Sequence, residues 1–303
     1  MTGPLPQQRS ASMFSEIEGQ EHMKSDQRAV AGPVKGGGAL DTSSHEEFYR
    51  YYARQSVSEE TRTRFLSLRG AVLRAIRMAR GDAMDGKALD ILDVGCGAGT
   101  HSALWAELDH RVHGLDISEQ LIQLARQRAA ADGLDVDFRV GTATSLPWTD
   151  SSMDVCLAQE LLEHVPDWGL CLDEFERVLR PGGILILSTN NKLCPFQHEF
   201  NLPFYSWYPA GLKRRFERLA VTTRKDLANF ATYPAVNWFT HYSLAAELRK
   251  RNFAVMDRFN VMDSTRMSRP KRFLLTLIGS VPPLRHAAFV VMTSIFVYAV
   301  KRV

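Results

Sequence analysis

A glycine-rich segment carries the clearest chemical signal in this sequence. Gly95, Gly97 and Gly99 stand at alternate positions directly after the apolar run 88–94. Glycines in this pattern allow a tight turn and let a ligand approach the backbone without interference from a Cβ atom. If a helix begins near Thr100, its first amides face that ligand. The spacing therefore predicts a binding loop between a strand and a helix.

Two aspartates frame this loop. Asp93 precedes the first glycine, where a carboxylate suits a cationic amino-acid group better than a pyrophosphate. Asp116 ends the next apolar run, at the distance where an acid can accept both hydroxyls of a ribose. Thr100 and His101 follow Gly99, so the GxGxxG spacing of nicotinamide enzymes is absent and a dehydrogenase is disfavoured. A plain tight turn with a helix-capping aspartate is the alternative.

A cluster of two carboxylates and one imidazole follows in the run QELLEH. If this turn is helical, Glu160 and His164 stand at i and i+4, with Glu163 between them on the same face. Such a group can hold a Mg²⁺-like ion, or leave His164 free as a general base. The alternative is a structural role, in which the run caps the next helix and shapes the pocket. His198 and His241 are further candidates for the base.

Predicted strands and helices alternate along the chain, and the candidate site residues fall at the ends of the predicted strands. Strands are predicted at 88–94, 111–115, 136–140, 153–158, 184–188, 254–259 and 294–300, and most are separated by helical patterns. This rhythm predicts an α/β fold with a parallel sheet covered on both faces. In such sheets, ligands bind beyond the carboxyl ends of the strands, where the strand order reverses.

Residues 1–44 are predicted to be a disordered tail, and residues 45–303 a single domain. Aromatic residues crowd an insertion at about 190–240, which forms either the wall of an acceptor site or the core of a small cap. The basic and apolar segment 269–279 is suited either to a membrane surface or to ordinary packing of a β-hairpin connection. Membrane contact and oligomeric state are left open.

Composition narrows the class of protein. The chain has 303 residues, 45% of them hydrophobic, and a net charge of +3 with both signs mixed, so nucleic acid is not an expected partner. Four scattered cysteines give neither a disulfide framework nor a zinc pattern. No secretory signal is recognised, and a cytoplasmic location is expected.

Several motifs together resemble class I S-adenosylmethionine-dependent methyltransferases in order and spacing. They are Leu92–Gly99, Gly114–Asp116, Ser145–Trp148, Asp154-Val155, Glu163–Val165 and Leu179–Gly183. The resemblance implies a Rossmann-like, doubly wound, seven-stranded and mostly parallel sheet, with Asp93 near the methionine part of the cofactor. The residues that it implies for cofactor binding are Arg69, Asp93, Gly95, Gly97, Gly99, Asp116, Ile117, Thr142, Ala143 and Gln159.

The QELLEH run is similar to that of the ubiquinone-biosynthesis O-methyltransferases. That similarity implies Glu160, Glu163 and His164 as ligands of a divalent metal such as Mg²⁺; His164 and His241 are retained as catalytic candidates. O-methylation of a small phenolic, quinol or lipid-linked acceptor, aromatic or isoprenoid in character, is the function that we expect. The alternatives are a metal-independent C- or N-methyltransferase acting on a sugar or natural product, and a catalytically silent binding protein of the same fold.

Overall fold

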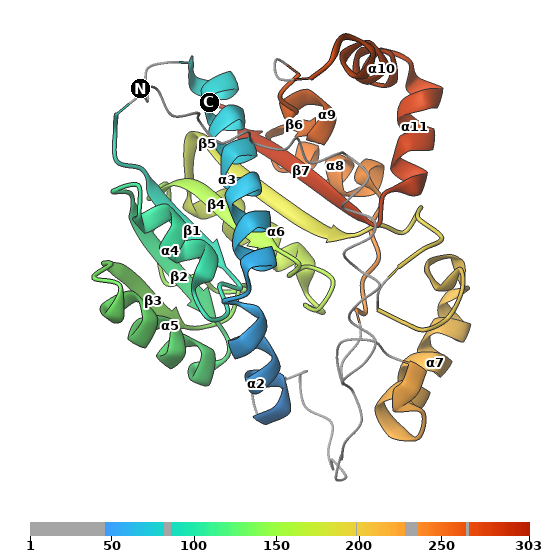
Figure 1. Ribbon diagram of the computed structural model, residues 1–303, viewed down its shortest axis with the longest axis horizontal. Coiled ribbons are helices and arrows are strands. Elements are labelled where there is room, and N and C mark those ends of the chain that lie inside the picture. The colour runs from blue at the N-terminus through green and yellow to red at the C-terminus, as the bar shows by residue number, and fades with distance from the viewer. Residues whose placement is uncertain (1–45, 82–85, 198, 228–234, 265–266) are drawn as a thin grey trace, which may run out of the picture. The chain divides into compact units, whose positions relative to one another are not determined.

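The protein is described here by a computed structural model (Figure 1). All described residues belong to the unit Leu40–Val303. They are residues 46–81, 86–197, 199–227, 235–264 and 267–303. The predicted disordered tail, residues 1–44, lies outside them, and so does His198.

One seven-stranded sheet organises the described residues, in the order β3-β2-β1-β4-β5-β7-β6. Its strands are β1 (Asp90–Val94), β2 (Arg111–Asp116), β3 (Val136–Val140), β4 (Met153–Gln159), β5 (Leu179–Asn190), β6 (Phe253–Asp257) and β7 (Ser294–Lys301). β7 runs antiparallel to β5 and β6, and the other pairings are parallel. The predicted seven-stranded, mostly parallel sheet is confirmed. The order reverses between β1 and β4, which places the expected ligand site at their carboxyl ends.

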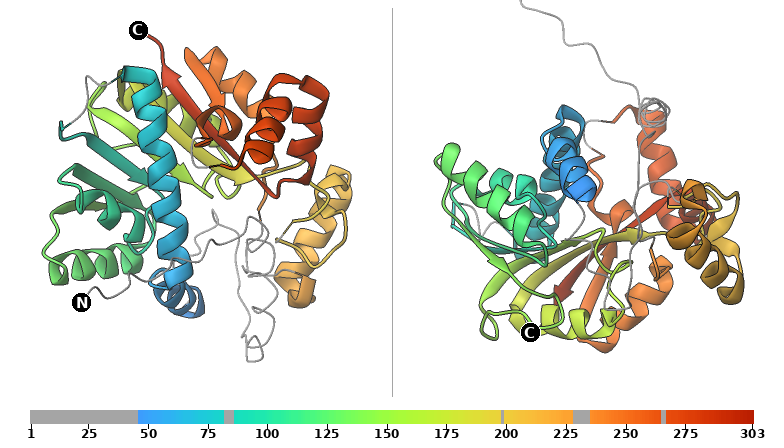
Figure 2. Two further views of the ribbon diagram at one scale, coloured as in Figure 1. Left: turned by 45° about the horizontal axis from the view of Figure 1, so that its top comes forward. Right: turned by 90° about the horizontal axis from the view of Figure 1, so that it is seen from below.

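Helices cover both faces of this sheet (Figure 2). They are α2 (Glu46–Gln55), α3 (Glu59–Arg80), α4 (Thr100–Ala106), α5 (Glu119–Ala131), α6 (Trp168–Val178), α7 (Ala210–Thr222), α8 (His241–Lys250), α9 (Arg258–Val261), α10 (Arg269–Ser280) and α11 (Pro282–Val291), with 3₁₀ turns η4 (Tyr205–Trp207) and η5 (Lys225–Leu227). α3, α4, α5 and α9 lie on one face, whereas α6 and α8 lie on the other.

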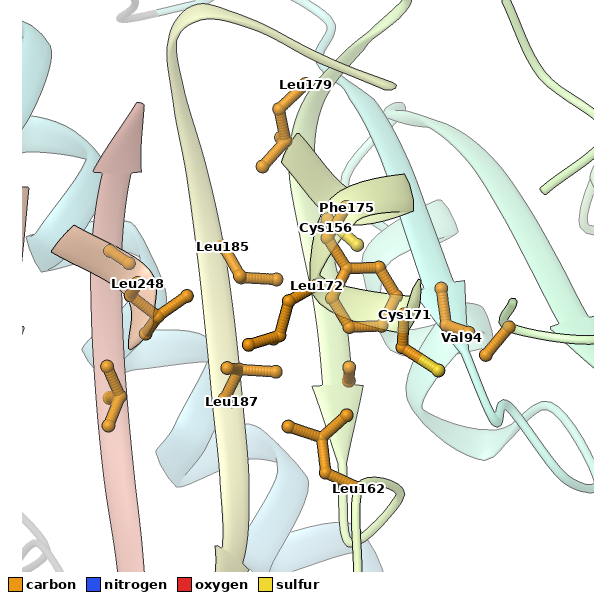
Figure 3. Packing of buried hydrophobic residues seen from close by; sticks show 14 of the residues in the cluster. Val94, Cys156, Leu162, Cys171, Leu172, Phe175, Leu179, Leu185, Leu187 and Leu248 are labelled. Carbon is orange, nitrogen blue, oxygen red and sulfur yellow. The ribbon is translucent and has the colours of Figure 1, made fainter. Parts of the chain in front are cut away.

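Apolar side chains of α6 pack against those of the central strands in the core beneath this helix (Figure 3). Phe175 of α6 is fully buried and lies against the strands, beside Cys156 of β4 and Leu185 of β5. Fully burying a side chain of this size stabilises the fold by about 1.5–3 kcal/mol. The central strands are therefore held rigidly, and the loops at their carboxyl ends are anchored.

The junction between α2 and α3 lies beside the glycine loop. α3 begins anew at this junction because Ser58 caps it by accepting a hydrogen bond from the Thr61 amide. The Thr100 hydroxyl donates to the Ser56 carbonyl at 2.7 Å, and Arg128 donates to the Ser56 hydroxyl at 2.7 Å. The junction is thereby fixed to the first residue of α4 and to α5.

The region after β5 has a small hydrophobic core of its own, packed beside α7. Tyr205 stacks on Phe200 with ring centroids 4.0 Å apart. The buried Lys213 ammonium donates to the Ser206 carbonyl and lies 4.5 Å from the Trp238 ring centroid. Phe200, Tyr205 and Trp238 belong to this core, whereas Phe196, Phe204 and Trp207 are more than half exposed, so both predicted alternatives stay open. That the region closes over an acceptor stays a prediction.

Helices lie between the last two strands, and the predicted β-hairpin connection there is wrong. β6 ends at Asp257 because its carboxylate caps α9, accepting hydrogen bonds from the Phe259 and Asn260 amides. α10 and α11 follow, and both carry a proline in the first turn, where its missing N–H costs nothing.

Candidate cofactor and acceptor site

The glycine loop connects β1 to α4 at the switch point of the sheet. The amides of Gly95 and Cys96 both donate to the Leu115 carbonyl of β2, at 2.7 and 3.1 Å. Gly95, Gly97 and Gly99 all have positive φ values, of 76°, 53° and 79°. The loop is therefore a fixed left-handed path that favours glycine.

Two of these glycines have different surroundings. A Cβ atom on Gly99 would lie 2.7 Å from Cζ of Phe138 and 2.8 Å from Cβ of Ala125, so the loop packs directly on α5 and β3. A Cβ atom on Gly97 would meet nothing within 4 Å. The space beside Gly97 is open, and this is the side from which a ligand can approach the backbone.

This contrast gives a testable prediction. We expect Gly97→Val to leave the protein folded, at a cost of about 1–2 kcal/mol for the left-handed backbone, while it obstructs the ligand. Gly99→Val should instead destabilise the protein by about 3 kcal/mol or more through overpacking. Thermal melts and titrations with S-adenosylhomocysteine measure both effects. Equal melting temperatures together with equal ligand affinities would contradict the assignment.

Asp116 ends β2 directly opposite this open space. Its carboxylate accepts hydrogen bonds from the Gly97 amide and from the Ser118 amide, each at 2.9 Å. Burial raises the pKa of Asp116, and the two amides oppose that shift. The next side chain, Ile117, is 56% exposed despite being apolar. An exposed apolar surface beside a fixed carboxylate suits a nucleoside, with the ribose on the acid and the base on the alkyl group.

Asp93 forms the second acidic position, at the floor of the loop. It is only 4% exposed, and the Ser102 hydroxyl donates to its Oδ2 atom at 2.7 Å. Burial, together with the charge of Asp116, raises the pKa of Asp93 to about 6. A buried carboxylate with a single side-chain hydroxyl donor is well placed to bind a cationic group of a ligand.

His101 is a site residue that the sequence interpretation missed. Trp105 donates its indole N–H to Nε2 of His101 at 3.2 Å, which fixes the ring proton on Nδ1. Nδ1 lies 3.9 Å from Oδ1 of Asp93 and 3.5 Å from the Gln159 amide. Burial lowers the pKa of His101 to about 3, so a neutral ring lies beside Asp93 without forming an ion pair.

Gln159, Thr142 and Ala143 lie on the loops that border this site. Gln159 is the last residue of β4 and contacts His101, as a neighbour of the cofactor would. Ala143 is buried, whereas the Thr142 hydroxyl bonds within its own turn to Thr144. The contacts of Thr142 and Ala143 with adenine stay predictions.

Arg69 lies beside α4, near the end of that helix that is remote from the glycine loop. Its guanidinium donates to the Leu104 carbonyl and lies 3.7 Å from the Glu107 carboxylate, at the C-terminal end of α4. The exposed carbonyls at the end of a helix attract a cation, and that end points away from the glycine loop. That Arg69 binds the cofactor stays a prediction.

The residues after β4 do not form the helical turn that was expected. Glu160 has a φ of 49°, a left-handed conformation that non-glycine residues rarely adopt. Its amide donates to the Ser188 carbonyl at 3.0 Å, and its Oε1 atom accepts from the Ser188 hydroxyl at 2.8 Å. This backbone turn holds the Glu160 side chain exposed at the carboxyl edge of the sheet.

Glu163 points into the protein. It is 1% exposed. Its Oε2 atom is buried, and no hydrogen-bond donor among the described residues reaches it. Burial and the neighbouring charge of Glu160 raise the pKa of Glu163 well above its usual range. The Glu163 carbonyl accepts the amides of Val236 and Asn237, which connects this turn to the segment before α8.

His164 lies on the accessible side of the same turn. Its ring keeps an exposed surface, yet the surrounding protein removes part of its hydration and lowers its pKa. The charges of Glu199 and Glu160 oppose this shift. His164 is therefore a neutral imidazole near two carboxylates, in a position open to an acceptor.

The described residues give the predicted metal site no support. No three His, Cys, Asp or Glu side chains in this part of the chain lie together in an arrangement that could hold a metal ion. Glu160 is engaged with Ser188, and Glu163 is buried and faces inward. His164 is left without the two partners that a shared ion would need.

His241 begins α8 at a distance along the sheet from the glycine loop. Its ring stacks on Phe289 of α11, with centroids 4.7 Å apart, and is 8% exposed. Burial lowers its pKa, the charges of Arg285 and Arg249 lower it further, and the charge of Asp257 at the end of β6 opposes the shift. The structure therefore places His241 in the packing between α8 and α11, and not with His164 and Asp93.

Comparison with known proteins agrees with this geometry. Residues 92–187 match the family described as a methyltransferase domain. A ubiquinone biosynthesis O-methyltransferase of Sinorhizobium fredii is 39% identical over 139 residues, 44% of this chain and 54% of that protein. A malonyl-[acyl-carrier protein] O-methyltransferase of Yersinia pestis is 39% identical over 99 residues, 33% of this chain and 36% of that protein. The chain thus spans about half or less of the length of these relatives.

A solved structure has the same fold. A protein of Pyrococcus horikoshii OT3 superposes with a TM-score of 0.53 at 19% identity, covering 85% of this chain and 100% of that one. At such low identity the likeness shows the fold alone. The predicted Rossmann-like class and the resemblance to methyltransferases are both confirmed.

Proposed function

We propose that this chain, whose residues 92–187 form a methyltransferase domain, transfers the methyl group of S-adenosylmethionine to an oxygen of a small phenolic, quinol or lipid-linked acceptor. The observation that carries this proposal is the placement of a buried carboxylate, Asp93, and a half-buried one, Asp116, on either side of an open glycine. Asp116 can accept the ribose hydroxyls, Asp93 can bind the cationic amino group, and the space beside Gly97 admits the nucleoside.

S-adenosylmethionine supplies an electrophilic methyl group on a sulfonium centre. The protein's part is to align the acceptor with that group and to exclude water, and alignment of this kind can lower a barrier by about 7–11 kcal/mol. An acceptor hydroxyl must also lose its proton. His164 is neutral and accessible, so a ring nitrogen can accept the proton.

Oxygen is the preferred acceptor atom for two reasons. The two relatives described above are both named O-methyltransferases. The site also offers a neutral imidazole beside the Glu160 and Glu199 carboxylates, which stabilise the imidazolium formed when an oxygen is deprotonated. The proposal uses no metal ion, because the Glu160–His164 turn does not assemble a ligand set.

Cofactor affinity should depend on the protonation of Asp93. As the pH falls through about 6, the Asp93 carboxylate gains a proton and loses the charge that binds the amino group. We expect the Kd for S-adenosylhomocysteine to rise below that pH, by up to about tenfold per pH unit. In Asp93→Asn the affinity should be weak throughout and nearly independent of pH between 5 and 8. The same pH dependence in Asp93→Asn as in the wild type would exclude this role.

A transfer assay tests the function as a whole. The protein is incubated with methyl-labelled S-adenosylmethionine and a panel of phenols, quinols and lipid extracts, and the products are analysed by mass spectrometry. Label on an oxygen is expected, with none in Asp116→Ala. Label on carbon or nitrogen would favour the alternative reaction class. Binding of the cofactor product without turnover of any acceptor would favour a catalytically silent protein.

A further inference from the structure

α10 exposes an apolar face that no described residue covers. None of the residues of this helix is buried, and Phe273, Leu274 and Leu277 are 70%, 52% and 37% exposed. Positions i, i+1 and i+4 lie on one side of a helix, so these side chains form a continuous stripe. Contiguous exposed apolar patches are rare on soluble proteins, and where they occur they commonly mark an interaction site.

α11 holds this stripe in a fixed orientation at the β6 side of the sheet (Figure 1). Phe289 is buried against His241, and Arg285 donates to the Asp257 carboxylate at 2.8 Å. α10 meets α11 at an angle of 105°. α11 is therefore anchored to the domain, while α10 faces outward.

The sequence segment that contains this helix carries charge of one sign. After Asp263 the sequence contains seven lysines and arginines and no aspartate or glutamate. The rest of the chain holds 30 basic and 34 acidic residues, so the cations are concentrated here. On the helix, Arg269 and Lys271 are exposed and border the apolar stripe on opposite sides. This combination of an apolar face and flanking cations complements an anionic lipid surface.

The lengths of α10 and α11 favour attachment to a membrane surface over a helix that spans the bilayer. No single described helix is long and apolar enough to cross a bilayer, and α10 and α11 reach the required length and composition only as a sharply bent pair. A helix that lies in the plane of the membrane surface buries only its apolar face, by about 5–10 Å.

We propose that the stripe of Phe273, Leu274 and Leu277, with its flanking Arg269 and Lys271, docks the protein on the surface of membranes that contain anionic lipids. The proposal is independent of the chemistry at the glycine loop. The stripe lies next to the edge strand β6, whereas the glycine loop follows the central strand β1. None of the residues of the stripe belongs to the cofactor site.

Co-sedimentation with vesicles tests this proposal on the full chain. Vesicles of phosphatidylcholine with 30% phosphatidylglycerol, at about 0.1 M salt, are compared with vesicles of pure phosphatidylcholine. Two variants are tested, Phe273→Ser/Leu274→Ser and Arg269→Glu/Lys271→Glu. The glutamates lie in the first turn of α10, where negative charge is favourable, so the helix should persist. Lys87→Glu/Arg126→Glu, which also reverses two exposed charges, and Met78→Ser, which removes another exposed apolar side chain, serve as matched controls.

The wild type should bind the anionic vesicles, and more weakly at 0.5 M salt. We expect each of the two variants to reduce this binding by about tenfold or more, whereas the controls and the affinity for S-adenosylhomocysteine stay unchanged. Equal binding to neutral and anionic vesicles, or no binding to either, would overturn the proposal. So would light scattering that shows a dimer in solution which Phe273→Ser/Leu274→Ser dissociates, because a second copy would then occupy the stripe.

Discussion

Replacing Asp116 by alanine should weaken the binding of S-adenosylhomocysteine by about 100-fold or more. The carboxylate is placed to accept two ribose hydroxyls, and hydrogen bonds to a charged group contribute about 1.5–3 kcal/mol each. It also accepts the Gly97 and Ser118 amides, so its loss relaxes the loop that forms the site. Isothermal titration calorimetry measures the affinity, and a thermal melt shows whether the variant is folded.

Two further variants make this result specific. Asp116→Asn keeps one acceptor oxygen and most of the shape, so its affinity should lie between those of the wild type and Asp116→Ala. Asp137→Ala removes an aspartate from the neighbouring strand β3, where it pairs with Arg139 and His113, and should leave the affinity unchanged. An Asp116→Ala protein that is folded and binds normally would rule out the ribose contact.

His164→Ala should reduce kcat by about 10²–10⁴-fold, the range typical for loss of a general base. The Kd for S-adenosylhomocysteine should stay within about twofold, because the ring lies on the acceptor side of the site. Since the pKa of His164 is lowered, the wild type should stay active below the pH at which an unperturbed imidazole is protonated. Added imidazole should restore part of the activity of the variant.

A matched control separates catalysis from folding. His113→Ala removes a partly exposed histidine of β2 that pairs with Asp137, and it should leave kcat unchanged. Unaltered kcat in His164→Ala, or a loss of activity that follows the thermal stability of both variants, would assign His164 a structural role. The base would then have to be sought elsewhere in the acceptor site.

Local pattern was enough to predict the cofactor side of the site. The glycine spacing, Asp93 and Asp116 all follow from one rule, that the carboxyl ends of neighbouring parallel strands meet at the same edge. The register of β1 and β2 places Asp93 beside Gly114, and the Gly97 amide reaches Asp116 as this rule requires.

Tertiary packing decided the residues that the sequence missed. Which side of α4 faces Asp93 depends on how this helix packs against α3, so His101 and Ser102 were not recognised. A histidine two residues after the last loop glycine was the available signal for His101.

The turn after β4 differs from its predicted form because of one backbone angle. The i and i+4 argument assumed a helical turn, but the left-handed Glu160 sends its own side chain outward while Glu163 turns inward. No pattern of apolar residues encodes such a conformation. α10 was missed for a different reason: its leucines were assigned to a strand connection, although Ser268 and Pro270 form a recognisable helix start.

The most direct test is a crystal structure of the protein with S-adenosylhomocysteine. The ribose hydroxyls should lie within about 3 Å of the Asp116 carboxylate, with the amino group toward Asp93 and the nucleoside over Gly97. Density for this compound at another location, or none at the carboxyl ends of β1 and β2 at saturating concentration, would contradict the proposed site and the function built on it.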